Sequence, residues 1–246
     1  MNIAVFADIH GNLEAFNSVM KEIHKENVDH IISLGDNIGY GADSEAVMGL
    51  LGKNRIESIL GNHELAIVNP DFIKWFNPNS KTAVLHAIDS LSEKSKNDIG
   101  TFKKNLVIQN MRFVHGTPPA SVALYLFQVS DRRLADKITK MNENICFTGH
   151  THDLGLIEYD GKTLVRKELK KGITTLDINK KYIINAGSVG QPRDEDHQAK
   201  YILFNTETMT LDLRYVQYDY KSAAQKIIAA GLPEEYARKL YPVDKR

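Results

Sequence analysis

The chain has 246 residues, 42% of them hydrophobic and 25% charged, which is the balance of a folded globular protein rather than a disordered or fibrous one. Its 31 basic and 31 acidic residues cancel, so no bulk charge favours a long nucleic acid or a membrane as partner. The single cysteine, Cys146, excludes an internal disulfide, and we expect a small buried hydrophobe there. Because the sequence shows neither a signal-peptide pattern nor an apolar run of membrane-spanning length, we expect a cytoplasmic protein.

The first part of the chain alternates short apolar runs with helical patterns. The apolar runs predict strands at 2–7, 30–35 and 56–61. Segments with apolar residues at helical spacing follow them at 13–27, 44–54 and 62–68. This alternation predicts a mostly parallel sheet covered on both faces, whose ligands gather beyond the carboxyl ends of the strands.

The middle of the chain is more polar. Residues 64–104 predict a helical insert or cap, with 80–94 as its longest helix. Two strands are predicted within 105–116, meeting at Asn110, and Ser130 opens a predicted helix over 130–144 that leads into the apolar run 145–148.

The part of the chain after residue 150 is rich in predicted strands. Residues 154–169 predict a hairpin that turns at Asp160 and Gly161. Further strands are predicted at 174–178, 181–187, 200–205 and 210–218, and two short helices at 220–241. We therefore expect a second, largely antiparallel sheet packed on the first. No repeat or linker divides the chain, so we expect one domain over 1–246.

Polar side chains gather in five loops that end or follow these strands, each beside a glycine. The loops carry carboxylates, imidazoles and one carboxamide: Asp8 and His10, Asp36, Asn62 and His63, His115, and His150 and His152. Five of the nine histidines lie here. Glycine allows loop conformations that other residues resist, so this repeated setting is not that of scattered core histidines.

Each of these residues alone has a simpler interpretation. His115 could be a hydrogen-bonded loop residue, Asp8 or Asp36 a helix cap, and Asn62 a turn former. A parallel sheet, however, would bring all five loops to one edge. Their conjunction predicts a shared metal site.

The types of ligand indicate the kind of metal site. Carboxylate, imidazole and carboxamide groups without a thiolate fit Mn²⁺ and Fe²⁺, with Co²⁺, Ni²⁺, Zn²⁺ and Mg²⁺ as alternatives. The seven candidates are too many for one tetrahedral ion and suit two ions that share a carboxylate. Paired ions of this kind promote in-line displacement at phosphorus. His63 is left without a metal and takes the role of general acid or transition-state stabiliser.

The ordered motifs resemble those of the calcineurin-like metallophosphoesterase superfamily. They stand here as Asp8-x-His10, Gly35-Asp36-x-x-Gly39, Gly61-Asn62-His63-Glu64, His115-Gly116 and Gly149-His150-x-His152. The resemblance implies an α/β fold in which two mixed sheets form a sandwich flanked by helices. It also implies two metal sites that share Asp36, one completed by Asp8, His10 and His152 and the other by Asn62, His115 and His150.

Residues 185–194, "NAGSVGQPRD", resemble a segment of small prokaryotic phosphodiesterase-like and diadenosine-tetraphosphatase-like members, with Ala186 in place of the usual proline. Arg193 in this segment could bind substrate phosphate or clamp a loop carboxylate. Asn12 could help the first helix bind phosphate or simply cap it. Tyr125 and Phe127 could stack a base, although such an aromatic pattern is more typical of a core.

The function expected from the sequence is hydrolysis of phosphate esters by a dinuclear metal centre. The resemblance favours small phosphodiesters and dinucleoside polyphosphates over phosphoproteins and phosphomonoesters, and we expect neither a long nucleic acid nor a membrane as partner. A catalytically silent protein-binding scaffold is the alternative from another class. It is disfavoured because all seven ligands and His63 are present.

Overall fold

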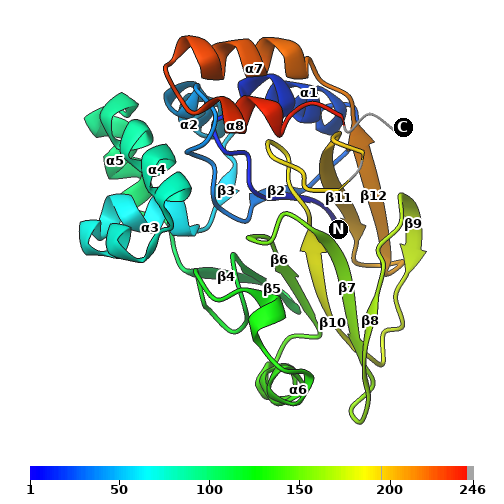
Figure 1. Cartoon of the computed structure of the whole chain (residues 1–246). Coiled ribbons are helices and arrows are strands. Elements are labelled where there is room, and N and C mark those ends of the chain that lie inside the picture. The colour runs from blue at the N-terminus through cyan, green and yellow to red at the C-terminus, as the bar shows by residue number, and fades with distance from the viewer. Residues whose placement is uncertain (195, 243–246) are drawn as a thin grey trace.

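The computed structural model describes residues 1–194 and 196–242; the predicted domain 1–246 also includes Glu195 and residues 243–246, which lie outside the described residues. Two six-stranded mixed sheets form its centre (Figure 1). The first sheet has the strand order β3 (Glu57–Ser58), β2 (His30–Ser33), β1 (Asn2–Phe6), β11 (Ala199–Asn205), β12 (Thr210–Val216) and β9 (Gly172–Thr175). The second has the order β4 (Asn105–Ile108), β5 (Met111–Val114), β6 (Ile145–Thr148), β10 (Lys181–Ala186), β7 (Leu154–Tyr159) and β8 (Leu164–Lys167).

Helices flank both sheets (Figure 1). The first sheet packs against α1 (Leu13–Ile23) and α2 (Ser44–Lys53), over which lie α7 (Tyr220–Ala229) and α8 (Glu234–Arg238). The outer face of the second sheet packs against α6 (Asp131–Lys140). A helical group occupies the segment predicted as an insert: α3 (Asn62–Val68), η1 (Pro70–Trp75), α4 (Pro78–Ser90) and α5 (Glu93–Gly100). The short η2 (Leu126–Gln128) precedes α6.

Strand β1 shows why this arrangement is stable. Successive side chains of a strand point to opposite faces, and the continuous apolar run of β1 therefore supplies two cores. Ile3 and Val5 are buried between the two sheets, whereas Ala4 and Phe6 are buried against the helices. The Phe6 ring packs edge-on against Phe16 of α1, with centroids 5.6 Å apart. Full burial of such side chains contributes about 1.5–3 kcal/mol each.

The parallel strands of both sheets end at the same side of the molecule. In the first sheet β1 is parallel to β2 and β2 to β3. In the second sheet β5 is parallel to β6 and β6 to β10. Six strand ends thus feed loops toward one region, which is where the predicted ligands lie.

The predicted assignment of strands to sheets was wrong. The two mixed sheets that the resemblance implied are confirmed, but the pattern itself predicted a mostly parallel sheet before residue 150 and a second, largely antiparallel sheet after it. Instead β5 and β6 lie in the second sheet beside β10, while β11, β12 and β9 extend the first. The reason is that side-chain alternation is the same whichever neighbour a strand pairs with, so the pattern does not encode the partner.

Two predicted strands were also wrong in extent. The run 56–61 forms a strand only at Glu57–Ser58, after which Ile59 makes a single bridge to Lys103. The strand expected at 174–178 is Gly172–Thr175. It ends there because Asp177 starts a turn, in which its carboxylate accepts a hydrogen bond from the Asn179 N–H at 2.9 Å.

Other local predictions are confirmed. The hairpin turns at Asp160 and Gly161, and two helices follow residue 219 with a break at 230–233. Cys146 is a free, buried residue in β6. Ser130 stands at the N-cap of α6, although its side chain makes no capping bond. None of the helices in the described part of the chain combines the length and apolar character needed to cross a lipid bilayer.

Candidate metal centre

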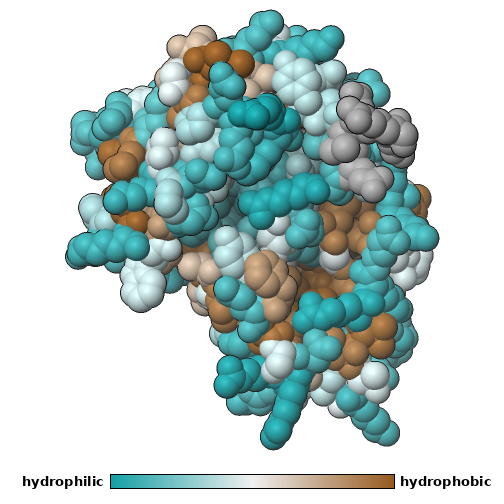
Figure 2. All heavy atoms as spheres, viewed as in Figure 1, coloured by the Kyte–Doolittle hydropathy of each residue, from teal (hydrophilic) through white to brown (hydrophobic). Residues whose placement is uncertain are grey.

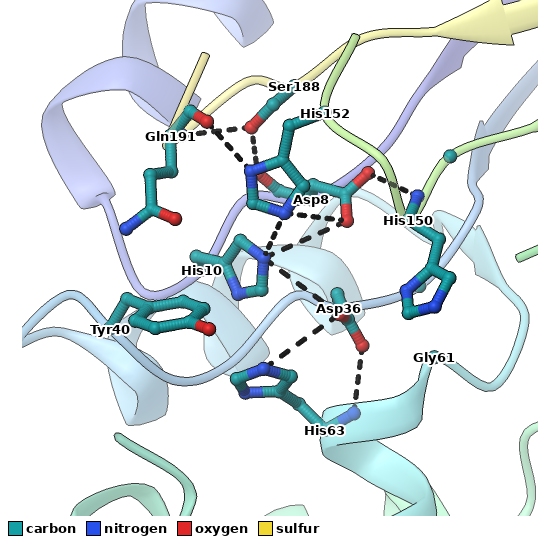
Figure 3. A network of polar contacts seen from close by, with 12 residues as sticks. Asp8, His10, Asp36, Tyr40, Gly61, His63, His150, His152, Ser188 and Gln191 are labelled. Carbon is teal, nitrogen blue, oxygen red and sulfur yellow. Dashed lines mark hydrogen bonds and ion pairs between the residues drawn. The ribbon is translucent and has the colours of Figure 1, made fainter. Parts of the chain in front are cut away.

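All seven predicted ligands converge on one buried centre between the ends of the two sheets. Figure 3 shows five of them: Asp8, His10, Asp36, His150 and His152. Three sets of side chains bring candidate ligand atoms within 4.8 Å of one another. These sets are Asp8, His10 and His152; Asp36, His115 and His150; and His10, Asp36 and His63. Asn62 joins the second set, because its Oδ1 lies 3.1 Å from His115 Nε2. Every one of these side chains is buried, by 93% or more.

The main chain at the centre is held in an unusual conformation. Five of the predicted ligands have a positive φ, between 50° and 69°: Asp8, His10, Asp36, His150 and His152. The left-handed region is rare for residues other than glycine and costs roughly 1–2 kcal/mol for an ordinary side chain. Such conformations concentrate at functional sites because the surrounding structure must enforce them.

Glycines permit the close approach of these loops. A β-carbon on Gly61 would collide with the backbone nitrogen and carboxylate of Asp36. A β-carbon on Gly190 would collide with the carbonyl oxygen of Ile9. Glycine is therefore required at both positions for the loops to meet.

Backbone carbonyls fix the orientation of all four predicted histidine ligands. His10 Nδ1 lies 3.1 Å from the Ile38 oxygen, His115 Nδ1 lies 2.8 Å from the Leu34 oxygen, and His152 Nδ1 lies 2.7 Å from the Gln191 oxygen. His150 uses its other nitrogen, Nε2, which is 3.1 Å from the Ala123 oxygen. Since a carbonyl only accepts, each of these nitrogens carries a proton, and in the neutral ring the opposite nitrogen presents a lone pair.

The lone pairs of His10 and His152 point at each other beside a carboxylate. Their Nε2 atoms are 3.0 Å apart, and Asp8 Oδ1 lies 3.4 Å from His152 Nε2 and 3.7 Å from His10 Nε2. Among the described residues Asp8 Oδ1 has no hydrogen-bond partner although it is buried. Its second oxygen, Oδ2, accepts a bond from the His150 N–H at 3.0 Å.

Asp36 stands between the two sets (Figure 3). Its Oδ1 accepts the backbone N–H of His63 at 2.9 Å. Its Oδ2 lies 3.3 Å from His115 Nε2, 3.8 Å from His10 Nε2 and 4.0 Å from His63 Nε2. One carboxylate oxygen therefore faces histidines of both sets.

Glu64 holds the Asp36 loop in place and was not recognised from the sequence. Its carboxylate is fully buried and accepts four N–H groups, from Asp36 N at 2.8 Å, Asn37 N at 2.6 Å, Asn37 Nδ2 at 3.1 Å and Gly61 N at 3.1 Å. Burial raises the pKa of Glu64 to about 7, while the four donors favour the carboxylate. The only signal in the sequence was its place at the end of the Gly-Asn-His-Glu motif.

The segment 187–193 supports the Asp8 loop from the other side. Ser188 Oγ donates to the Asp8 carbonyl at 2.8 Å, and the same carbonyl accepts the Gly190 N–H at 3.0 Å. The Gln191 carbonyl orients His152. The sequence had suggested only Arg193 from this segment, because carbonyl and hydroxyl contacts leave no residue-type signature.

Asn12 serves as a helix cap. Its Oδ1 accepts the Ala15 N–H at 3.1 Å and its Nδ2 donates to the Gly190 carbonyl at 2.9 Å. Both polar atoms of the side chain are thus engaged within the fold. This agrees with the capping alternative, and a phosphate contact at Asn12 stays a prediction.

Burial and neighbouring charges separate the two central carboxylates. Burial raises the pKa of Asp8 to about 8, and Asp36 adds to this effect. Burial alone would also raise the pKa of Asp36, but His115 and His63 hold it well below its usual value. His115 shows the complementary effect, because Asp36 overcomes the influence of burial and raises its pKa to about 9. Burial lowers the pKa values of His10, His152 and His150, the last to about 3.

These residues fit divalent cations. An unpartnered buried carboxylate oxygen and two facing imidazole lone pairs are unfavourable on their own, and a cation between them relieves both. The neutral side chains of His10, His150 and His152 and the ionised carboxylate of Asp36 are in the protonation states that metal ligands need. Each imidazole donates a hydrogen bond to a backbone carbonyl from its other nitrogen, as metal-bound histidines usually do.

A cleft of about 420 Å³ opens above the centre. Figure 2 shows this face of the molecule, with polar side chains around a central hollow. The helical segment 72–80 and residues 123–128 both line the cleft, together with Arg193. Tyr40 also lines it and packs edge-on against the His10 ring, with centroids 4.8 Å apart. Tyr40 was missed because a lone tyrosine in a loop carries no distinctive pattern.

Two residues left open by the sequence reach this cleft. Arg193 Nη1 donates to the Thr151 carbonyl at 3.3 Å, and within the described residues it pairs with no carboxylate. Tyr125 stacks on the His150 ring, with centroids 3.8 Å apart and planes at 11°. The core interpretation of the aromatic pair was wrong, since Tyr125 lines the cleft and Phe127 is 68% exposed.

Comparison with known proteins agrees with this centre. The calcineurin-like phosphoesterase superfamily domain matches residues 1–209. An uncharacterised protein of Methanocaldococcus jannaschii is 31% identical over 244 residues, which are 97% of each chain. The crystal structure of a metallophosphoesterase from Sphaerobacter thermophilus superposes with a TM-score of 0.84 at 28% identity, covering 98% of both chains. A hypothetical protein of Pyrococcus horikoshii OT3 shares the fold, with a TM-score of 0.77 at 18% identity over 100% of this chain and 99% of that one. The chain therefore belongs to the calcineurin-like phosphoesterase superfamily and is a metallophosphoesterase.

Proposed function

We propose that the protein hydrolyses small phosphodiesters or dinucleoside polyphosphates with two divalent metal ions bound at the centre described above. The observation that carries the proposal is the convergence of seven ligand side chains on one centre, five of which line a 420 Å³ cleft. A cleft of this volume lies within the range of small-molecule sites, roughly 300–1,000 Å³.

The ligand sets suggest how two ions divide among the residues. Asp8, His10 and His152 would hold one ion, and Asn62, His115 and His150 the other, with Asp36 between them. When bound, two such ions supply positive charge to the phosphoryl oxygens and lower the pKa of an attacking water. The nitrogen and oxygen donors favour Mn²⁺ or Fe²⁺, with Zn²⁺, Co²⁺, Ni²⁺ and Mg²⁺ as alternatives.

His63 is positioned to act on the leaving group. Its ring lines the cleft, and among the described residues its Nδ1 is buried without a hydrogen-bond partner. The backbone N–H of His63 is held by Asp36 Oδ1, which fixes the start of α3 beside the centre. We assign the imidazole to donate a hydrogen bond or proton to the departing oxygen.

Arg193 supplies the remaining positive charge at the cleft. Within the described part of the chain its guanidinium makes one hydrogen bond, to the Thr151 carbonyl, so other N–H groups remain to bind a phosphoryl oxygen. The zero net charge of the chain gives no general attraction for a long polyanion. Both features favour a small phosphate ester bound within the cleft.

The test combines metal analysis with product analysis. Protein stripped with a chelator and reloaded with Mn²⁺ should retain two ions per chain and hydrolyse bis(p-nitrophenyl) phosphate. With diadenosine tetraphosphate, AMP plus ATP would indicate asymmetric cleavage and two ADP symmetric cleavage. Asp36→Asn should lose metal and turnover together. Protein that binds two ions but cleaves only phosphoserine peptides or phosphomonoesters would refute the substrate class, and protein inert to every ester would favour a scaffold.

The role of His63 has its own test. His63→Ala should slow an ester with a poor leaving group, such as a methyl ester, far more than one with a good leaving group, such as a p-nitrophenyl ester. General-acid catalysis contributes typically 10²–10⁴-fold. Equal slowing of both esters, with metal content unchanged, would contradict the assignment.

A further inference from the structure

The walls of the cleft are strongly aromatic. Five aromatic side chains line it: Tyr40, Phe72, Trp75, Phe76 and Tyr125. Phosphate chemistry alone does not require such walls, because the metal ligands and Arg193 account for recognition of the charged group. The aromatic surface therefore bears on the part of the substrate that lies beyond the phosphate.

Four of these five rings are already packed against other rings. Tyr40 contacts His10, His63 and Tyr236. Phe72 and Phe76 pack edge-on against each other at 5.6 Å, and Phe76 also packs against His63.

Tyr125 is packed in the same way, between the His150 ring at 3.8 Å and the Phe127 ring at 4.9 Å. These packed rings shape the cleft and offer little free face.

Trp75 differs from the other four. It ends η1, is 83% exposed, and makes no ring contact with another aromatic residue of the described chain. A tryptophan exposed to this degree at the rim of a cleft presents an unused stacking surface. Its neighbours Phe72 and Phe76 anchor the turn that carries it.

We propose that Trp75 stacks on a nucleobase of the substrate, so that the protein selects phosphodiesters or phosphoanhydrides that carry a nucleoside. This inference rests on the proposed hydrolytic function. The phosphate binds at the metal centre, and the base lies against the indole at the rim. Stacking suits every base, because each has a π face, so the selection is for the presence of a base rather than for its identity.

Trp75 is the single tryptophan of the chain, so its emission reports this contact directly. Mg²⁺-loaded protein should be titrated with AMP and, as the matched ligand without a base, with ribose 5-phosphate. AMP should quench and shift the emission, and ribose 5-phosphate should leave it unchanged. Free N-acetyltryptophanamide corrects for absorption by adenine. Equal responses to the two ligands would overturn the proposal.

A kinetic comparison separates this inference from the hydrolytic function. The substrates are thymidine 5′-(p-nitrophenyl phosphate) and methyl p-nitrophenyl phosphate, which share a leaving group and differ in the nucleoside. In Trp75→Ala the ratio of kcat/KM for the first to that for the second should fall about 5- to 150-fold, as expected for loss of one base-stacking contact. Trp75→Phe should restore most of the ratio, and Tyr241→Ala, an exposed aromatic change outside the cleft, should not alter it.

The outcomes differ for the two proposals. Absence of hydrolysis of both esters by wild-type protein that contains two metal ions would refute the proposed function. Hydrolysis of both esters with an unchanged ratio in Trp75→Ala would refute the stacking role alone.

Discussion

Replacing Glu64 by glutamine tests whether this buried carboxylate builds the metal centre. In the wild type, four N–H groups point at its two oxygens at 2.6–3.1 Å. Glutamine offers one oxygen and one NH₂ group, so two donors lose their acceptor whichever way the amide is turned. Hydrogen bonds to a charged group contribute about 1.5–3 kcal/mol each, which gives a loss of about 3–6 kcal/mol. This is a large part of the total free energy of unfolding of a typical protein, roughly 5–15 kcal/mol.

The loss should appear in both stability and metal affinity. With a urea m-value of roughly 3 kcal/mol/M, the unfolding midpoint of Glu64→Gln, followed by far-UV circular dichroism, should fall by about 1–2 M. Metal affinity should weaken about 10- to 100-fold, because Asp36 and Asn62 are no longer held. The matched control is Glu93→Gln on α5, whose side chain is 84% exposed and which should behave as wild type. A midpoint within about 0.3 M of wild type would show that the four contacts are not what holds the loop.

Other parts of the structure offer further tests. Gly61→Ala places a β-carbon against the main chain of the metal centre and should lower the free energy of unfolding by about 1–3 kcal/mol. Its control is Gly49→Ala, exposed on α2 with nothing within 4 Å of its β-carbon, which should raise the free energy of unfolding by about 0.5–1 kcal/mol. Equal effects of the two changes in thermal melts would contradict the clash. Burial alone would raise the pKa of Glu143, but two bonds from Arg112 hold it below its ordinary value of 4.5. The stability from this ion pair is full above pH 4.5 and is lost as the pH falls through the lower folded-state pKa of Glu143. Glu143→Gln should therefore reduce the fall of the unfolding free energy at acid pH. Curves of unfolding free energy against pH that run parallel for variant and wild type would argue against this contribution. Tyr236→Ala removes a fully buried ring from α8 and should lower the free energy of unfolding, measured in urea, by about 3–5 kcal/mol. A decrease below about 1 kcal/mol would mean that α8 is not part of the core.

The candidate ligands were predictable because their chemistry is carried by residue type and position together. Asp8, Asp36 and His150 each follow an apolar run in a loop that contains a glycine, and strand ends converge in this class of fold. That inference did not require the correct strand pairing. The loops meet because parallel strands of both sheets end on one side, even though the strands that carry them are divided between two mixed sheets.

The supporting groups could not be predicted in the same way. The carbonyls of Ile38, Leu34 and Gln191 orient histidines, and a backbone carbonyl is present at every residue. The burial of Glu64 depends on tertiary packing, since glutamate is usually exposed. The exposure of Trp75 is likewise a property of the folded surface. Sequence patterns therefore indicate which atoms can bind a metal, whereas the fold determines how they are held.

The left-handed backbone at Asp36 bears on how the centre should be probed. Its φ of 54° is strained for most residues, but aspartate and asparagine tolerate this region better than others. An alanine at this position would change the backbone preference and remove the carboxylate at once, and the two effects could not be separated. Asparagine keeps the size, the backbone tolerance and an oxygen to accept the His63 N–H, and it replaces the charged oxygen that faces His115 and His10 by an NH₂ group. Loss of metal in Asp36→Asn therefore reports on the carboxylate itself, because the loop that carries it has no reason to move.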